Sequence, residues 1–335
     1  MEDRKVTIAD IADALGVSTA TVSNVLHGKT KKISDKTVKR VQEKIEEMKY
    51  IPNMAAILLA QNNSRIIGIV INDHPKYEGR VLEDGYISSA LNGLMKVIND
   101  SGYFLMVKTT TDWNDIPAIS SMWNMEGIIL SGFCEADYSK LRANMHIPFV
   151  VYDGYFPEND RIVNLTIDNY DGGYKVGEYL KTMGHKKALC ISDNFICMDK
   201  DRIEGFRKAF GDDKTEVLQV PMEKKERYTF YEKNWSKVLA CTAVFAVSDY
   251  YAIDFIQYVK RKGLDIPRDI SVVGFDDSMM SEGSNPPLTT VRQDSTYRAK
   301  KAVECLKKMR AGESVEHTIA LPVTLSVRES VCKRD

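Results

Sequence analysis

From residue 66 onward, short apolar runs alternate with amphipathic segments, and this alternation limits the fold more than any other feature of the sequence. The run Ile66–Ile71 is continuously apolar, as is typical of a parallel strand buried on both faces. Comparable runs lie at 103–107, 127–130 and 148–153, and a helix is expected at 87–98. Alternating strands and helices predict a parallel sheet covered by helices on both faces.

The same pattern restarts after residue 164. Strands are expected at 187–192, 243–247 and 270–275, helices at 173–183, 202–210, 229–239 and 251–262, and a last strand at 320–327. Two successive strand–helix series predict two doubly wound α/β subdomains, each built on a parallel sheet.

The N-terminal part of the chain has a purely helical pattern. Thr7 and Asp10 have the spacing of a capping box, and Gly16 can end the helix that follows. Ser18 can then cap a second helix at 19–26, whose apolar stripe leaves small polar side chains facing outward. Two short helices joined by such a turn form a helix-turn-helix, whose second helix can enter the major groove of DNA. The alternative is a small three-helix bundle that binds nothing.

Basic side chains gather in the same region, although the whole chain has a net charge of −1. Residues 22–44 contain seven Lys or Arg and two Asp or Glu, and Ser34 can cap a third helix within this stretch. Because attraction to phosphates depends on the local patch, this concentration favours binding to nucleic acid. A solvated helix face is the simpler alternative.

A short apolar segment separates the helical part from the strand–helix series. Asn53 can cap a helix over 54–60, but a helix of two turns is not stable alone in water. It needs the protein core, its own copy in a dimer, or a DNA groove to cover it. A buried connector helix is therefore the alternative to a DNA-dependent hinge.

Four stretches follow one another in a fixed order: VTIADIADALGVSTATVSNVLHGK at 6–29, MKYIPNMAAILLA at 48–60, ISVVGFDD at 270–277 and NPPLTTVRQD at 285–294. Together they resemble the LacI/GalR family of bacterial transcription regulators over essentially the whole chain. The resemblance implies a helix-turn-helix headpiece, a hinge helix that forms on DNA, and an effector-binding core of two periplasmic-binding-protein-like subdomains. It also implies a repressor that binds a pseudo-palindromic operator as a homodimer.

The resemblance sets the expected domain boundaries. The headpiece would span 1–52, the hinge 53–62 and the core 63–330. Within the core, subdomain 1 would comprise 65–163 with 293–321, and subdomain 2 would comprise 164–292 with 322–330, so that the chain crosses between them near 163, 292 and 322. No leucine heptad follows the last expected strand, which favours a dimer over a tetramer.

Carried onto this sequence, the resemblance assigns DNA contacts to the headpiece and the hinge. Thr19, Ala20 and Asn24 would read bases, since Asn can pair with adenine and a Thr or Ala methyl can pack on thymine. Leu59 would wedge into the minor groove, with Leu58 as the alternative. Phosphate and other DNA contacts are expected at Thr7, Ser18, Thr21, Ser23, Lys29, Lys31, Lys32, Tyr50, Asn53 and Ala56.

The effector is expected at the carboxyl ends of the strands, where ligands bind in open α/β sheets. Asp153 and Asp276 each end a strand, Arg202 would open a helix, and all three match effector-contacting positions of the family. Such charges suit a sugar or another polar ligand, because they can hold vicinal hydroxyls. Weaker candidates are Asp73 after the first strand, Tyr228 in a loop before the 229–239 helix, and Ser248 with Asp249 at the cavity edge. For each acid, a helix cap or a surface ion pair is the alternative.

Other classes of protein fit the sequence poorly. No GxGxxG follows the first strand, HExxH and GxSxG are absent, and the six cysteines form neither a CxxC pair nor a zinc spacing. We therefore expect no catalysis, metal or cofactor. No apolar run approaches the length of a membrane span, and no secretory signal opens the chain, so a cytoplasmic location is expected. An exported sugar-binding transport protein would share the core fold, but it would carry a signal and lack the headpiece.

Overall fold

The computed structural model describes residues 5–51, 64–133, 138–155 and 162–335. The chain divides into two compact units, Met1–Asn63 and Ser64–Asp335. Each unit has a hydrophobic core of its own.

The N-terminal unit contains three helices: α1 (Ile8–Leu15), α2 (Thr19–Leu26) and α3 (Asp35–Glu47). Each begins at the expected cap, because the side chains of Thr7, Ser18 and Ser34 accept hydrogen bonds from backbone N–H groups of the first turn. Gly16 ends α1 in the left-handed conformation, at a φ of 64°. The helices pack around a small core of Ile11, Ala12, Val22, Val25 and Val41. The helix-turn-helix prediction is therefore confirmed.

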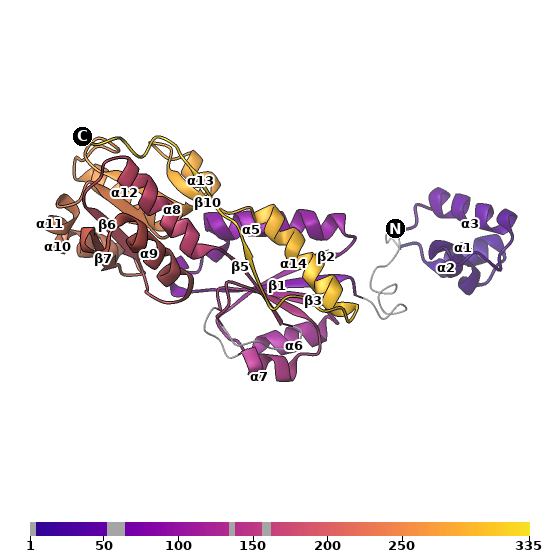
Figure 1. The fold of residues 1–335 in the computed structure, drawn as a ribbon. Coiled ribbons are helices and arrows are strands. Elements are labelled where there is room, and N and C mark those ends of the chain that lie inside the picture. The colour runs from indigo at the N-terminus through magenta and orange to yellow at the C-terminus, as the bar shows by residue number, and fades with distance from the viewer. Residues whose placement is uncertain (1–4, 52–63, 134–137, 156–161) are drawn as a thin grey trace. The chain divides into compact units, whose positions relative to one another are not determined.

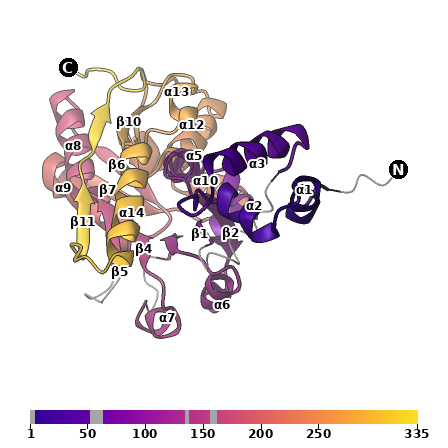
Figure 2. The same ribbon diagram turned by 90° about the vertical axis from the view of Figure 1, so that its right-hand side faces the viewer.

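Two six-stranded sheets form the second unit. Sheet 1 has the order β11-β5-β4-β3-β1-β2 and is parallel throughout. Its strands are β1 (Ile66–Asn72), β2 (Phe104–Thr110), β3 (Gly127–Ser131), β4 (Phe149–Tyr152), β5 (Ile162–Ile167) and β11 (Thr318–Leu321). The helices α5 (Gly85–Asp100) and α14 (Ser295–Arg310) cover one face, and α6 (Asp115–Met122) and α7 (Tyr138–Asn144) cover the other (Figures 1 and 2).

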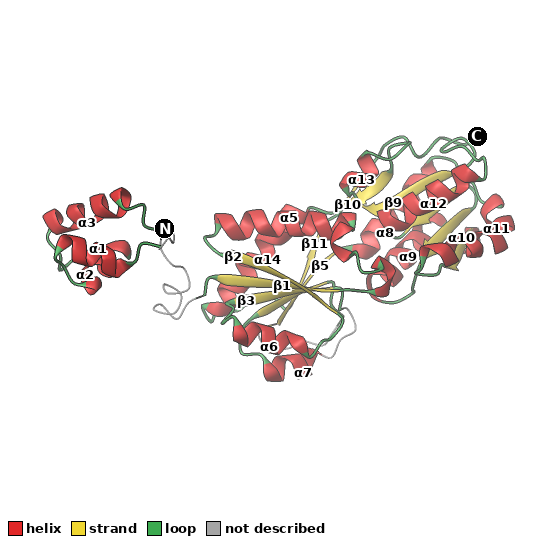
Figure 3. Cartoon of the chain, turned by 180° about the vertical axis from the view of Figure 1, so that it is seen from behind, coloured by secondary structure: helices red, strands yellow, loops and turns green. Residues whose placement is uncertain are grey.

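Sheet 2 has the order β12-β10-β9-β8-β6-β7. Its strands are β6 (Ala188–Ser192), β7 (Thr215–Gln219), β8 (Ala243–Ala246), β9 (Ser271–Asp276), β10 (Thr289–Arg292) and β12 (Thr324–Ser326), and only β12 pairs antiparallel. Its helices are α8 (Asn169–Thr182), α9 (Cys197–Phe210), α10 (Lys224–Lys233), α11 (Trp235–Leu239), α12 (Asp249–Arg261) and α13 (Met279–Glu282) (Figure 3). The predicted fold class, a helical headpiece with two doubly wound α/β subdomains, is confirmed.

Three 3-10 turns complete the described elements: η1 (Pro75–Tyr77), η2 (Val81–Glu83) and η3 (Asp212–Lys214). The first two lie between β1 and α5, so the segment after β1 is longer than a simple turn. In both sheets the strand order reverses beside the first strand, between β1 and β3 and between β6 and β8. Such switch points create the crevices in which ligands of doubly wound folds bind.

Two expected boundaries are wrong in detail. The first crossing between subdomains follows residue 167 instead of 163, because β5 pairs with β4 and β11 along its whole length in sheet 1. The single strand expected at 320–327 is two strands, β11 in sheet 1 and β12 in sheet 2. Pro322 lies between them and cannot donate a ladder hydrogen bond, so the chain leaves one sheet there and enters the other.

Two helices that pack on sheet 2 begin earlier than expected. Helix α8 starts at Asn169 and α9 at Cys197, so Arg202 lies in the second turn of α9 instead of opening it. Glycines let these two helices pack closely: a Cβ on Gly173 would lie 1.9 Å from the Arg202 carbonyl oxygen. This close packing presses the backbone of Arg202 against α8.

Candidate functional site

The second helix of the headpiece has two different faces. Val22 and Val25 are buried in the headpiece core, whereas Thr19, Ala20 and Asn24 are exposed. The exposed side chains are short, so they leave room for a close approach to base edges. All three residues expected to read bases therefore lie on the accessible face of α2.

The other residues expected to contact DNA from the headpiece differ in their exposure to solvent. Thr7, Ser18, Lys29, Lys31 and Lys32 are exposed, while Thr21, Ser23 and Tyr50 are half-buried. The hydroxyls of Ser18 and Thr21 lie 2.9 Å apart in a hydrogen bond at the start of α2. The expected hinge contacts Asn53, Ala56 and Leu59, with the alternative Leu58, lie outside the described residues.

A cavity of about 180 Å³, called here the cleft cavity, lies at the carboxyl ends of the strands of both sheets. Asn72 at the end of β1, Gly132 after β3 and Asp153 after β4 line it from sheet 1. Sheet 2 contributes Asp193 after β6, Val247 after β8 and Asp276 at the end of β9. The cavity therefore occupies the switch points of both sheets.

Asp153 is buried against an arginine from α14. The Arg298 guanidinium lies 2.9 Å from its carboxylate, and the Thr166 hydroxyl donates to the same carboxylate over 2.9 Å. Arg298 also donates to the Leu165 carbonyl and to the Tyr86 hydroxyl. Asp153 adopts a left-handed backbone, with a φ of 55°, at the point where β4 turns into the cavity. Arg298 thus makes it possible to bury this carboxylate.

Arg202 reaches the cavity from the side of sheet 2. Its Nε donates to the Asn169 side chain over 2.8 Å, and its Nη1 donates to the Val247 carbonyl over 2.6 Å. Its guanidinium lies 3.7 Å from the centre of the Phe275 ring. These contacts fix the arginine in one orientation at the cavity wall.

Asp276 lies 3.9 Å from Arg202, and its other contact is the Gln293 amide, which donates over 2.8 Å. Burial raises the pKa of Asp276 well above its usual range, although Arg202 opposes the rise. Asp153, Arg202 and Asp276 are brought together around one cavity.

Ser248 and Asp249 form hydrogen bonds that hold the start of α12 in place. Ser248 caps the helix and lines the cleft cavity. Asp249 is buried, and its carboxylate accepts hydrogen bonds from the Ser278 N–H at 2.8 Å and the Thr290 hydroxyl at 2.6 Å. Asp249 therefore ties α12 to the neighbouring loop and strand; it neither caps the helix nor forms a surface ion pair, and it lines the second cavity described below instead of the cleft cavity.

Two expected effector residues do not line the cleft cavity. Asp73 lies between the lining residues Asn72 and His74, and its N–H bonds to the Thr110 carbonyl beside β2. Because side chains of extended backbone alternate in direction, Asp73 is turned away.

The prediction that Tyr228 contacts the effector is also wrong. It lies inside α10, not in a loop, and its ring packs on Tyr258 of α12 with 5.2 Å between ring centres. The Arg261 guanidinium lies 5.4 Å from the same ring. The ring is thus engaged between two helices and is not free to stack on a ligand.

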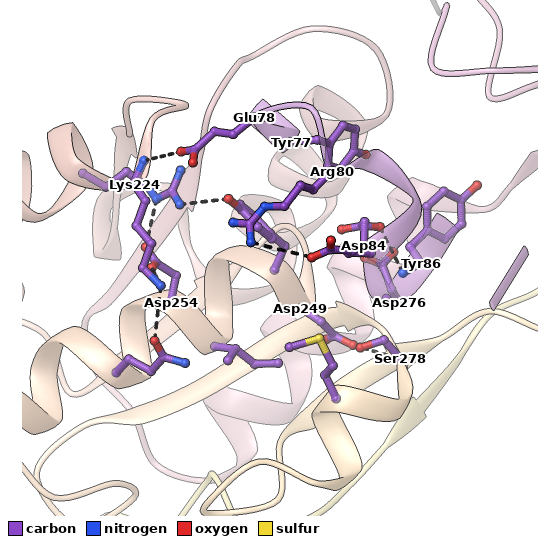
Figure 4. A pocket seen from close by; sticks show the side chains of 17 residues that line it. Tyr77, Glu78, Arg80, Asp84, Tyr86, Lys224, Asp249, Asp254, Asp276 and Ser278 are labelled. Carbon is purple, nitrogen blue, oxygen red and sulfur yellow. Dashed lines mark hydrogen bonds and ion pairs between the residues drawn. The ribbon is translucent and has the colours of Figure 1, made fainter. Parts of the chain in front are cut away.

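A second cavity of about 250 Å³, the side cavity, adjoins the first and shares Tyr77, Asp84, Tyr86, Tyr250 and Asp276 with it (Figure 4). Here the segment after β1 reaches across to the helices of sheet 2. Glu78 accepts a hydrogen bond from the Lys224 N–H at 3.4 Å, and the Tyr250 hydroxyl donates to the Lys76 carbonyl over 3.3 Å. The two subdomains are therefore linked directly across the cavities.

Among the residues that the structure describes, no group of three or more His, Cys, Asp or Glu could hold a metal ion. No helix in these ranges has the length and apolar character that crossing a bilayer requires.

Known proteins resemble the chain over nearly its whole length. Residues 7–53 match the model for bacterial regulatory proteins of the lacI family, and 178–331 match a periplasmic binding protein-like domain. The HTH-type transcriptional repressor PurR of Vibrio cholerae is 30% identical over 312 residues, which cover 90% of each chain. The chain belongs to the LacI family of bacterial transcription regulators.

Another relative and two solved structures are similar to nearly the whole chain. The HTH-type transcriptional regulator DegA of Bacillus subtilis is 28% identical over 97% of the chain and 98% of its own length. The lac repressor dimer bound to operator and the anti-inducer ONPF has the same fold, with a TM-score of 0.83, 22% identity, and coverage of 98% of this chain and 100% of that one. The transcriptional regulator CelR in complex with cellobiose gives a TM-score of 0.70 at 21% identity, over 97% and 100% of the two chains.

Several residues of the site in this LacI-family protein are absent from the residues expected from its sequence. Asp193 comes directly after β6, so the same strand-end rule that singles out Asp153 could have found it. Lys76 lines the cavity from the irregular segment after β1, whereas Arg298 pairs with Asp153 from α14, more than a hundred residues away in sequence. No local pattern points to Arg298, because tertiary packing alone brings it to Asp153.

Proposed function

We propose that this LacI-family protein is a sequence-specific transcriptional repressor that binds a pseudo-palindromic operator as a homodimer. The observation that carries the proposal is the exposed face of α2, where Thr19, Ala20 and Asn24 project from a rigid helix-turn-helix. Recognition helices of this kind read bases in the major groove, and nearby lysines supply phosphate contacts. The repressor names of PurR proteins and the operator complex of the lac repressor dimer support it.

The cleft cavity is the proposed effector site. Asp153, which Arg298 supports from behind, lines it from sheet 1, and Arg202 and Asp276 line it from sheet 2, so a ligand that contacts these three residues bridges the subdomains. Paired carboxylates and guanidinium groups suit the hydroxyls of a sugar or sugar derivative. Structures of similar fold contain cellobiose or ribose, which is consistent with a ligand of this class.

The proposed mechanism is a coupling between the two sites. A ligand that bridges the subdomains favours one angle between them and so changes where the two chains of a dimer emerge toward their headpieces. A coupling of about 1–3 kcal/mol changes operator affinity roughly 5–150-fold, and the operator changes ligand affinity by the same factor.

Selection of DNA by the full-length protein tests this function. Random duplexes bound by the protein should converge on a site with two-fold symmetry, and sedimentation should show two chains on each selected duplex. The Arg202→Ala variant should select the same site. No convergence, or convergence on a site without symmetry, would contradict the proposal.

A further inference from the structure

Carboxylates outnumber cations around the cleft cavity. Asp84, Asp153, Asp193, Asp199 and Asp276 line it, against Lys76 and Arg202. Three of the five acids are compensated by fixed groups: Asp153 by Arg298, Asp276 by Arg202, and Asp84 by two N–H groups at the start of α5. The remaining two, Asp193 and Asp199, lie on the wall contributed by sheet 2. Asp199 accepts hydrogen bonds from the Ser192 hydroxyl and the Asn194 amide, but neither acid has an ion pair within 4.0 Å among the described residues.

The wall around Asp193 contains buried polar groups with few partners. Asp193 is 3% exposed, and its Oδ1 accepts a hydrogen bond from Asn194. Burial and a hydrogen bond to Asp193 raise the pKa of Tyr251, so this hydroxyl lies beside the carboxylate, whereas the buried hydroxyl of Tyr152 has no partner among the described residues. Buried polar groups are nearly always fully paired, so the unused lone pairs of Asp193, Tyr251 and Tyr152 leave room for a ligand that supplies donors.

The surroundings of Lys76 show the sign of the electrostatic potential in this part of the cavity. Burial alone would lower the pKa of Lys76, but the neighbouring Tyr77, Asp193, Tyr251 and Asp199 raise it well above its usual value. Its ammonium forms no ion pair within 4.0 Å in the described part of the chain, and it lies 5.0 Å from the centre of the Tyr77 ring. The field at this point therefore favours a positive charge, and an anion placed beside Lys76 would face Asp193 and Asp199.

The aromatic side chains of the cavity favour the same sign of charge. Tyr77, Tyr86, Tyr152, Tyr250 and Tyr251 all line it. Tyrosine faces attract organic cations, and tyrosine hydroxyls accept hydrogen bonds from ammonium groups. Acidic and aromatic walls together are the chemistry of a site for a protonated amine.

On these grounds, and resting on the proposed function, we propose that the effector is a hydroxylated molecule with a protonated amino group, such as an amino sugar. Its hydroxyls bind Asp153, Arg202 and Asp276, and its ammonium binds Asp193 and the Tyr251 hydroxyl. Lys76 competes for this ammonium position, because its own charge faces the same acids on a flexible stem.

Matched sugars test the proposal with the full-length protein. The melting temperature and the Kd are measured with glucosamine, galactosamine and mannosamine, each beside its neutral parent sugar, its N-acetyl derivative and the 6-phosphate of the parent sugar. At least one amine should bind about 10-fold more tightly than its neutral and N-acetyl partners, as expected for a charge-assisted hydrogen bond in a buried site. Equal or weaker binding of every amine, including no binding at all, would overturn the proposal.

Two variants distinguish a site for cations from a site for anions. Asp193→Asn should remove the preference for the amine, whereas Lys76→Met should strengthen amine binding several-fold by removing the competing charge. A control, Asp212→Asn, changes an acid whose side chain is 73% exposed and which is absent from the lining of the cavity, and it should change nothing. Loss of binding in Lys76→Met, or tightest binding of a 6-phosphate, would overturn the amine assignment.

The outcome separates this inference from the proposed function. A neutral or phosphorylated sugar that binds through Arg202 and changes operator affinity would leave the repressor assignment intact while excluding an amine. Unchanged selection of DNA by Asp193→Asn shows that the variant is folded.

Discussion

Two arginines each lie beside a buried carboxylate at the cleft cavity. Arg298 pairs with Asp153 and lies 4.1 Å from the centre of the Tyr152 ring, while Arg202 lies over Phe275. A buried charge is costly unless it is paired and hydrogen-bonded. Each arginine therefore supports a carboxylate that lines the cleft cavity, and its guanidinium packs on an aromatic ring.

Removing Arg298 should leave Asp153 as an uncompensated buried charge. We expect Arg298→Leu to lower the free energy of unfolding by about 3–5 kcal/mol, as is typical when one partner of a buried pair is lost. Urea denaturation measures this change. Arg268→Leu is the control, since its side chain is 77% exposed and its ion pairs are on the surface, and it should change stability by no more than about 0.5 kcal/mol. Equal effects of the two variants would contradict the role of Arg298.

Asp249 should make stability depend on pH. Burial raises the pKa of Asp249 from 3.8 to about 6, although hydrogen bonds from Thr290 and Ser278 oppose the rise. The folded protein thus holds this proton more tightly than the unfolded chain. The resulting stability is fully present below about pH 4 and is lost as the pH rises through 6, by up to about 1.4 kcal/mol per pH unit. Denaturation from pH 4 to 7 should show a shallower decline for Asp249→Asn than for the wild type; parallel curves would contradict the assignment.

The candidate site can be predicted from the sequence as far as local rules reach. Asp153 and Asp276 end strands, and the carboxyl ends of parallel strands meet at one edge, so both line the cavity. The predictions for Tyr228 and Asp73 are wrong because the direction of a side chain depends on its element and its packing partners. Lys76 is missed because the segment after β1 is irregular, and Arg298 because a helix distant in sequence brings it to Asp153.

At the scale of elements, α2 combines a buried stripe with an accessible face. Ala20→Glu would place a negative charge on the face proposed to enter the major groove and should, by repelling DNA phosphates, weaken operator binding at least about 10-fold. Ala14→Glu makes the same change at an exposed position of α1 and is the control. Fluorescence anisotropy of a labelled selected duplex measures both. Equal affinities for the two variants would move DNA recognition away from α2.

The close packing of α8 on α9 is a second element-scale feature. A methyl group on Gly173 would collide with the backbone of Arg202, so Gly173→Ala should force the helices apart and destabilise the protein by about 1–3 kcal/mol. Gly283→Ala is the control, because the nearest atom to its added Cβ would lie 3.7 Å away. Urea denaturation compares the two, and equal stability would show that the helices can adjust.

Most helices and strands are predictable because their signals are local. Caps at Thr7, Ser18 and Ser34 fix the starts of the headpiece helices, and continuous apolar runs mark the central strands. Edge elements are harder: β12 has only three residues, and its place in sheet 2 depends on pairing with β10. The pattern at 320–327 holds no signal for that change of sheet except Pro322.

At the scale of the whole molecule, three chain segments join the two subdomains of the core. They lie between β5 and α8, between β10 and α14, and between β11 and β12. Contacts across the cavities add to these covalent links, as between Tyr250 and the Lys76 carbonyl. A ligand held from both sides can therefore select one arrangement of the subdomains, which is the requirement for allosteric control.

The central claim is that the cleft and the operator site are coupled. The most direct test is the affinity of the full-length protein for its selected operator, measured by fluorescence anisotropy with and without a saturating ligand from the sugar panel. We expect a change of roughly 5–150-fold, in either direction, that disappears in Arg202→Ala. Equal operator affinity with the cleft cavity filled and unfilled would contradict the account.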